Sequence, residues 1–371
     1  MGLKEEIEQR RAEIHSDGYP MSIGEILNLY RDGELDIHPE FQRFYRWDEA
    51  QKSRLIESLL LGIPIPSIFV SQRPDGVWDV IDGLQRLSTI FQLVGVLKDQ
   101  DGNLLDPLVL SKTKYLPSLE GKKWEDEARP EVAIGVDHQL LIKRSKIDIK
   151  IILRESSESS KYELFQRLNT GGSQLTDQEL RNCILITVNP DAYTWLTDLA
   201  QDTNFKTCVT LTDRAESEQY NVELIVRFLV FRRLAESKLK GIGDIGEFLT
   251  DELVELGESL KTSTERQRFE EKAFRFTFEK LAQALGEDSF KRYDVEKGRF
   301  AGGFLLSAFE AIAIGVGYNF ELYQTSNLPD VAAVARDLWG NEEFDRSTGS
   351  GVRASSRVPV IIPLGRRLFA P

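Results

Sequence analysis

Between residues 67 and 97 the spacing of apolar residues changes once, from the pattern of a strand to that of a helix. This change limits the folds that the segment can adopt. The runs SIFVSQ and VWDVID are rich in β-branched and aromatic residues and flank a Pro-Asp-Gly turn, which predicts a β-hairpin. From Leu84 onward, apolar residues recur at the spacing of a helix. Asp82 and Gly83 therefore lie where a strand passes directly into the first turn of a helix.

Other patterns support the same mixture of strands and helices. A helix that begins after Asp48 and ends at Gly62 has a capping-box start and a glycine stop. Alternating isoleucines over residues 146–152 predict a half-buried strand that returns to the sheet of the hairpin. The sequence therefore predicts an α+β fold.

These elements also suggest how the chain is divided. We expect a small mixed sheet with helices over residues 1–189 and a mainly α-helical domain over residues 190–345. Residues 98–144 are charged and turn-rich and are interpreted as an insertion into the first domain. Residues 346–371 hold five arginines and no acidic residue and are interpreted as an Arg-rich C-terminal tail.

The charge and composition exclude several classes of protein. A formal net charge of −13 and a pI near 5.0 argue against a protein that coats nucleic acid by bulk electrostatics. The charged N-terminus and the lack of a long apolar run predict a cytoplasmic protein without a membrane anchor. The three histidines and two cysteines show no metal-ligand or paired-thiol spacing, so we expect no zinc, haem or flavin.

The turn in IDGLQRL has the features of a phosphate site. Gly83 lets the backbone approach a ligand closely, the first amides of the helix point outward, and Arg86 can offer two N–H donors. Asp82 would engage a magnesium ion or orient a water molecule, and Gln85 would position the ligand. The local sequence also has a simpler interpretation, in which Asp82 caps the helix and pairs with Arg86.

The stretch FQRFYRW places Gln42, Arg43 and Trp47 among further aromatic residues directly before the capped helix. Aromatic rings can stack on a base, while arginine binds phosphate and glutamine reads polar edges. Alternatively, the aromatic residues fill the junction between helix and sheet and the arginines extend into solvent.

The loop NTGGSQLTDQE supplies Asn169, Gly171 and Gly172, which are suited to an anion-binding nest or to contacts with a ribose. The same residues equally form the end of one helix and the start of the next.

The C-terminal arginines Arg353 and Arg357 can contact phosphate or nucleic acid, or can simply neutralise an acidic protein. A different chemistry is suggested by Asp148 and Lys150, which with Glu131 or Asp137 upstream have the residue types of a metal-dependent nuclease. Strand alternation explains this charged pair equally well.

Taken together, FQRFYRW, LLLGIPIPSIFV, WDVIDGLQRLSTI and LFQRLNTGGSQLTDQELRN resemble the domain of unknown function 262 family, the GmrS-type N-terminal part of GmrSD restriction systems. The resemblance runs from about Ile37 to Ile186. At the turn the family reads Asp-Gly-Gln-Gln-Arg, and Leu84 replaces its first Gln. The other matching positions are Gln42, Arg43 and Trp47 in the first motif and Asn169, Gly171, Gly172, Leu175 and Glu179 in the third.

The resemblance implies a ParB/sulfiredoxin-like fold with a nucleotide pocket, magnesium-dependent NTP hydrolysis, and a role in bacterial defence against phage or modified DNA. It also implies a separate nuclease partner, because the His-containing nuclease domain of such systems has no counterpart in this sequence. Our leading hypothesis is an NTP-dependent sensor or regulatory subunit. The alternatives are a non-hydrolysing module that binds DNA or a partner under nucleotide control, and an intrinsic nuclease. The sequence leaves the oligomeric state open.

Overall fold

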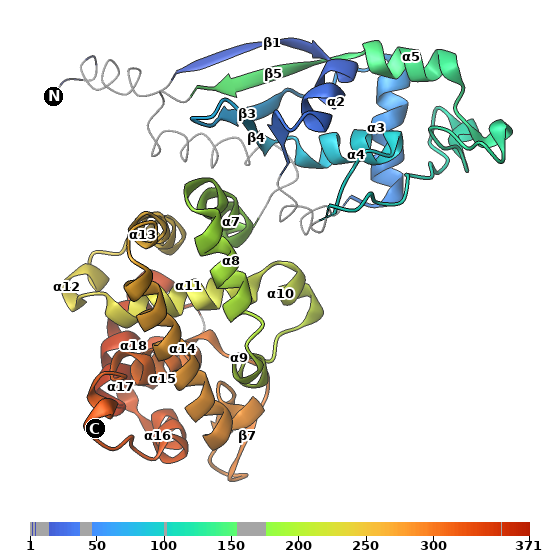
Figure 1. Cartoon of the computed structure of the whole chain (residues 1–371). Helices are drawn as coiled ribbons and strands as arrows, with labels where there is room; N and C mark the ends of the chain where they lie inside the picture. The colour runs from blue at the N-terminus through green and yellow to red at the C-terminus, as the bar shows by residue number, and fades with distance from the viewer. Residues whose placement is uncertain are drawn as a thin grey trace. The chain divides into compact units, whose positions relative to one another are not determined.

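The computed structural model shows two compact units, Met1–Gln174 and Leu175–Pro371 (Figure 1). The first unit ends earlier than the boundary expected at residue 189, because helix α7 (Asp177–Val188) packs against α8 (Pro190–Leu199) and α13 (Ile245–Leu260). The residues that the structure describes are 2, 4, 15–37, 47–99, 102–153, 176–349 and 351–371.

A five-stranded mixed sheet forms the first unit and confirms the expected α+β class. Its middle strands β3 and β4 form the predicted antiparallel hairpin, and β5 is the predicted returning strand, parallel to β3. The edge strands are β1, antiparallel to β5, and β2, parallel to β4. The order across the sheet is β1 (Ser16–Ser22), β5 (Lys146–Ile152), β3 (Ile68–Gln72), β4 (Trp78–Asp82) and β2 (Leu35–Asp36).

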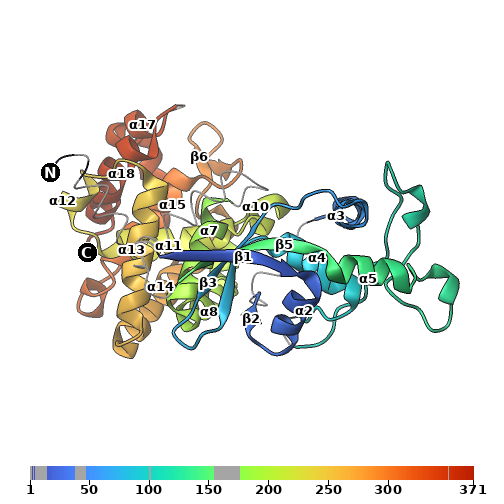
Figure 2. The ribbon, with the colours of Figure 1, turned by 90° about the horizontal axis from the view of Figure 1, so that it is seen from above.

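Four of the helices that the structure describes share one hydrophobic core with this sheet. Strand alternation in β5 buries Ile147, Ile149 and Ile151 and leaves Asp148 and Lys150 exposed. Figures 1 and 2 show the helices next to the sheet, and their apolar faces contribute buried leucines, isoleucines and Phe91 to the core. The helices are α2 (Ile23–Arg31), α3 (Glu49–Leu61), α4 (Leu84–Val94) and α5 (Val136–Arg144).

The segment expected as an insertion is packed onto the first unit. It includes helix α5 and the short turns η2 (Pro117–Leu119) and η3 (Pro130–Val132), and Figure 2 shows its loops extending beyond α5. Trp124 is buried in the core of the unit. The buried carboxylate of Glu57 on α3 accepts from the backbone N–H of Tyr115 at 2.8 Å, which fixes the loop to the helix.

The second unit is mainly helical, as predicted. Helix α15 is buried over most of its length and contacts α11, α14 and α18, which makes it the centre of the unit. After α7 and α8, the unit contains α9 (Thr203–Cys208), α10 (Asp213–Ser217), α11 (Tyr220–Arg233), α12 (Glu236–Leu239), α13, α14 (Thr264–Ala284), η4 (Gly286–Asp288), the hairpin β6 (Arg292–Asp294) and β7 (Arg299–Ala301), α15 (Leu306–Tyr318), η5 (Leu322–Gln324), α16 (Val331–Asp337), η6 (Leu338–Gly340), α17 (Glu342–Thr348) and α18 (Ala354–Leu368).

The segment expected as an Arg-rich tail forms the end of α17 and the whole of α18, which is a core helix. Helices α15 and α18 cross closely because their contact is made by small residues. A Cβ atom added at Gly365 would lie 2.1 Å from the carbonyl oxygen of Ala311, and one at Gly315 would lie 2.5 Å from the carbonyl oxygen of Gly365. Glycine is therefore required at both crossing positions.

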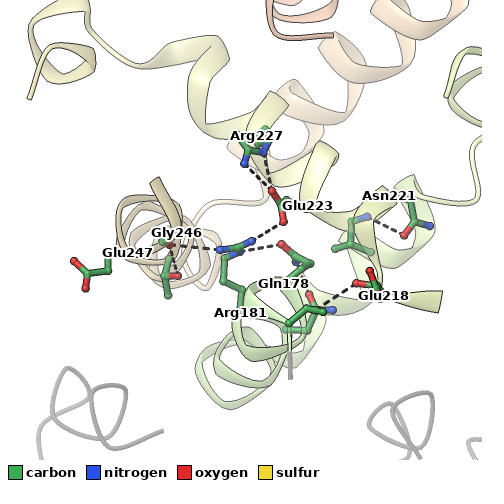
Figure 3. A network of polar contacts seen from close by, with 12 residues as sticks. Gln178, Arg181, Glu218, Asn221, Glu223, Arg227, Gly246 and Glu247 are labelled. Carbon is green, nitrogen blue, oxygen red and sulfur yellow. Dashed lines mark hydrogen bonds and ion pairs between the residues drawn. The ribbon is translucent and has the colours of Figure 1, made fainter. Parts of the chain in front are cut away.

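A chain of buried and half-buried arginines and glutamates connects four helices of this unit. Figure 3 shows Arg181 of α7 and Arg227 of α11 pointing toward Glu223, with N–O distances of 2.9 and 2.7 Å. Arg227 also binds Glu310 of α15 at 3.1 Å, and Arg357 of α18 binds the same carboxylate at 2.8 Å. The Glu310 side chain has no exposed surface, so the free energy of this arginine–glutamate chain depends on complete pairing.

Substitution of Gly365 by alanine tests the crossing of α15 and α18. The added methyl group has no space, so we expect a loss of about 1–3 kcal/mol in the free energy of unfolding. Thermal unfolding of Gly365→Ala should be compared with that of Gly303→Ala, where no atom lies within 4 Å of the added Cβ. Equal melting temperatures for the two variants would contradict the close crossing.

The arginine–glutamate chain is tested by Glu310→Gln, which keeps the shape of the side chain and removes its charge. Removing one partner of a buried ion pair typically costs about 3–5 kcal/mol, and we expect denaturant unfolding to show a loss of this order. The control is Glu342→Gln, whose ion pair with Arg346 is largely exposed and should contribute less than about 1 kcal/mol. Similar stabilities for both variants would mean that the buried chain is not a main source of stability.

Candidate functional site

Strand β4 passes into helix α4 through a single glycine. Gly83 has φ of +103°, a value that favours glycine, and a Cβ atom there would lie 2.1 Å from Cδ1 of Ile68. Gly83 is the N-cap residue of α4 and provides no side-chain cap hydrogen bond to the first turn of the helix. The positive end of the helix dipole lies at this turn, and such a position favours an anion.

The predicted site residues Asp82 and Arg86 form an ion pair with an N–O distance of 2.9 Å. The guanidinium group of Arg86 also donates to the backbone carbonyl oxygens of Pro66 and of Ser67, the latter at 3.1 Å. The side chain of Arg86 is only 11% exposed, whereas that of Asp82 is 33% exposed. Arg86 thus braces the turn against the segment before β3, and the Asp82 carboxylate stays within reach of solvent.

The structure brings the end of the first motif to the second. The backbone N–H of Trp47 donates to Oε1 of Gln85 at 3.4 Å, and Trp47 packs against the core of the unit. Asp48 follows it and forms the predicted capping box with Gln51 at the start of α3. The entrances of α3 and α4 are therefore neighbours. Gln42 and Arg43 lie outside the described residues.

Farther along the same two helices, the structure shows a polar contact that the sequence analysis missed. Nζ of Lys52 on α3 donates to Oε1 of Gln92 on α4 at 3.0 Å, and burial lowers the pKa of the Lys52 ammonium group. Gln92 lies seven residues, or two helical turns, after Gln85, so both glutamines lie on the α4 face toward α3. That spacing was a signal in the sequence that could have identified the contact.

The third motif is only partly described. Asn169, Gly171 and Gly172 lie outside the described residues. The motif continues into α7, where Arg181 donates to Oε1 of Gln178 at 2.9 Å and to the Glu223 carboxylate (Figure 3). These polar side chains of the motif therefore pack inside the second unit.

The two C-terminal arginines differ in their surroundings. Arg353 is exposed at the start of α18, and Arg357 donates from two nitrogens to the buried carboxylate of Glu310. Arg357 therefore contributes to the core of the second unit, and only Arg353 presents its side chain to solvent.

The residues of the nuclease alternative are not gathered at one point. Asp148 and Lys150 lie on the exposed face of β5, while Glu131 is in η3 and Asp137 is in the first turn of α5. Within the described ranges, no three His, Cys, Asp or Glu side chains are placed to hold a metal ion together.

None of the helices that the structure describes is long and apolar enough to cross a membrane.

The comparison with protein families agrees with the motif analysis. Residues 23–186 match the family model described as GmrSD restriction endonuclease, N-terminal domain. This range contains the turn at Gly83, helices α3 and α4, and most of α7. Comparisons with curated proteins and with solved structures found no match. On the strength of the family match, residues 23–186 of this chain belong to the GmrSD restriction endonuclease N-terminal domain family.

Proposed function

We propose that this chain is an NTP-binding and NTP-hydrolysing sensor or regulatory subunit of a bacterial restriction system, acting against phage or modified DNA with a separate nuclease. Its family places it in a restriction system. The observation that supports nucleotide binding is the turn between β4 and α4, where a glycine with positive φ precedes a helix without a side-chain cap.

In this proposal the amide groups after Gly83 bind the phosphate groups of the NTP. Asp82 engages the magnesium ion that accompanies the nucleotide, because magnesium is commonly held by one or two carboxylates together with substrate phosphates and water. A single partly exposed carboxylate fits this arrangement. Gln85 holds the entrance of α3 beside the turn through its bond to Trp47. Arg86 positions the turn and adds positive charge near the phosphates.

Family resemblance extends the proposed pocket to residues outside the described part of the chain and gives it a ParB/sulfiredoxin-like fold. The further nucleotide-binding residues in this proposal are Gln42, Arg43, Asn169, Gly171 and Gly172.

A site that hydrolyses an NTP mainly has to position the reacting groups. In phosphoryl transfer the protein orients a water molecule in line with the terminal phosphate and stabilises the charge on its oxygens. The amide groups of α4 and the magnesium ion at Asp82 would provide that stabilisation, and a rigid turn would keep both in place during the reaction.

One contact favours a second candidate, a nucleotide switch that does not hydrolyse its ligand. Oδ2 of Asp82 is bound by Arg86 at 2.9 Å. If the bound nucleotide leaves this ion pair intact, the carboxylate has less capacity to engage magnesium or water, and the NTP acts only as a conformational ligand.

The test of hydrolysis is phosphate release by the purified chain with ATP, GTP, CTP and UTP and magnesium, with and without DNA. We expect Asp82→Asn to reduce turnover about 100-fold, because one electrostatic contact to the reacting group is lost, and to change NTP affinity much less. Asp148→Asn is the matched control, since Asp148 is exposed on β5 of the same unit. NTP binding without turnover in the unmodified chain would select the switch, and equal turnover in both variants would refute the role of Asp82.

Arg86→Lys tests whether Arg86 positions the turn. Lysine keeps the charge but cannot donate to Asp82 and to the carbonyl oxygens of Pro66 and Ser67 at the same time. We expect about tenfold weaker NTP binding together with a loss of about 1–3 kcal/mol in stability, measured by calorimetry and denaturant unfolding. Arg54→Lys on the exposed side of α3 should leave both quantities unchanged. Full NTP affinity in Arg86→Lys would contradict the proposed role.

A further inference from the structure

The second unit contains a hollow of about 490 Å³ beside its only described hairpin. It lies between β6, β7 and η6, and we name it the hairpin hollow. Its volume falls within the range of about 300–1,000 Å³ that small-molecule sites occupy. The residues that line it include Arg292, Tyr293, Asp294, Glu296, Gly302 and Trp339.

Two aromatic rings in the lining are held in place by other rings. Trp339 meets Phe344 edge to face with ring centroids 5.2 Å apart, and Tyr293 meets Phe300 with centroids 5.1 Å apart. Both lining rings remain partly exposed. Braced aromatic rings with an accessible surface are suited to stacking on a planar ligand, because little side-chain entropy is lost on binding.

The charged side chains of the lining differ in whether another residue compensates their charge. Asp294 accepts from Nζ of Lys297 at 2.7 Å, so its charge is compensated. Arg292 and Glu296 are exposed, and neither side chain forms an ion pair or hydrogen bond with any residue in the described part of the chain. The hollow thus offers one unused guanidinium group and one unused carboxylate beside two aromatic rings.

The aromatic rings, the guanidinium group and the carboxylate together indicate which class of ligand fits the hairpin hollow. A purely anionic ligand would be repelled by Glu296, and a purely cationic one by Arg292. A nucleotide suits both, because its base stacks on aromatic rings, its phosphate binds arginine, and an exocyclic amino group donates to a carboxylate. We propose that the hairpin hollow binds a single unstacked nucleotide whose base carries an exocyclic amino group. The proposal does not rest on the NTP site at Gly83.

The proposal is tested with the full chain and short labelled homopolymers of deoxycytidine, deoxyadenosine and thymidine, followed by fluorescence anisotropy. We expect the cytosine and adenine strands to bind about tenfold more tightly than the thymine strand, which has no exocyclic amino group. Competition by free dCMP and dAMP distinguishes a free nucleotide from a nucleotide within a strand, and either result supports the site.

Three substitutions assign the binding to the hollow. Glu296→Ala should remove the preference for amino bases, which a loss of structure would not do. It should not weaken thymine binding, because it also removes a charge that repels phosphate. Trp339→Leu should weaken all strands by about 5- to 150-fold, the range for loss of one stacked base. Arg292→Ala should weaken all strands about tenfold. Because Glu296 and Arg292 are exposed, their variants remain informative even if Trp339→Leu fails to fold.

Two control variants complete the test. Arg299→Ala, on the same hairpin but outside the hollow, should bind as the unmodified chain does. Arg54→Ala, at an exposed arginine of α3 in the first unit, should also bind normally, and a loss there would assign the binding to the first unit and overturn the proposal. Equal affinity for cytosine and thymine strands, or equal losses in Arg292→Ala and Arg299→Ala, would likewise overturn it.

Discussion

The pairing of the buried carboxylate of Glu310 and the half-buried carboxylate of Glu223 with three arginines is the constraint on which the helical unit depends. Glu223 and Glu310 together contact Arg181, Arg227 and Arg357, and these five residues lie on α7, α11, α15 and α18. Each charge would be costly if it were buried alone, so the pairs that join different helices offset the desolvation of their charges only when the four helices assemble. The helix that ends the family-matched region is therefore fixed inside the second unit.

The turn between β4 and α4 of the first unit depends on a steric constraint at one residue, Gly83. The close approach of Ile68 leaves no room for a side chain there, and Arg86 connects the turn to the carbonyl oxygens that precede β3. The amide groups of α4 are thus held in place, and in the proposed NTP site this would lower the entropy cost of binding a phosphate group. The proposed NTP site and the hairpin hollow share this design, since each is built on side chains or backbone already braced by their neighbours.

Prediction from the sequence succeeded where the decisive interactions are local and failed where they are distant. The β3–β4 hairpin and the capping box at Asp48 were predicted because each is formed within a few residues. Residues 346–371 were interpreted as a tail because five arginines without an acidic residue suggest a solvated segment, yet most of them form α18, which includes Pro359 and Pro363. The partner of Arg357 is Glu310, 47 residues earlier, and no local pattern indicates that pairing.

The sequence by itself determined strands β3, β4 and β5, helices α3 and α4, the glycine turn at Gly83 and the family to which residues 23–186 belong. These features follow from steric and hydrogen-bonding preferences within one turn of chain. Only the tertiary structure decided which charged side chains are engaged within a unit and which remain exposed to solvent. Arg86 and Arg357 are both engaged within their units while Arg292 stays exposed, because the packing of distant segments sets the solvation and the partner of each charge.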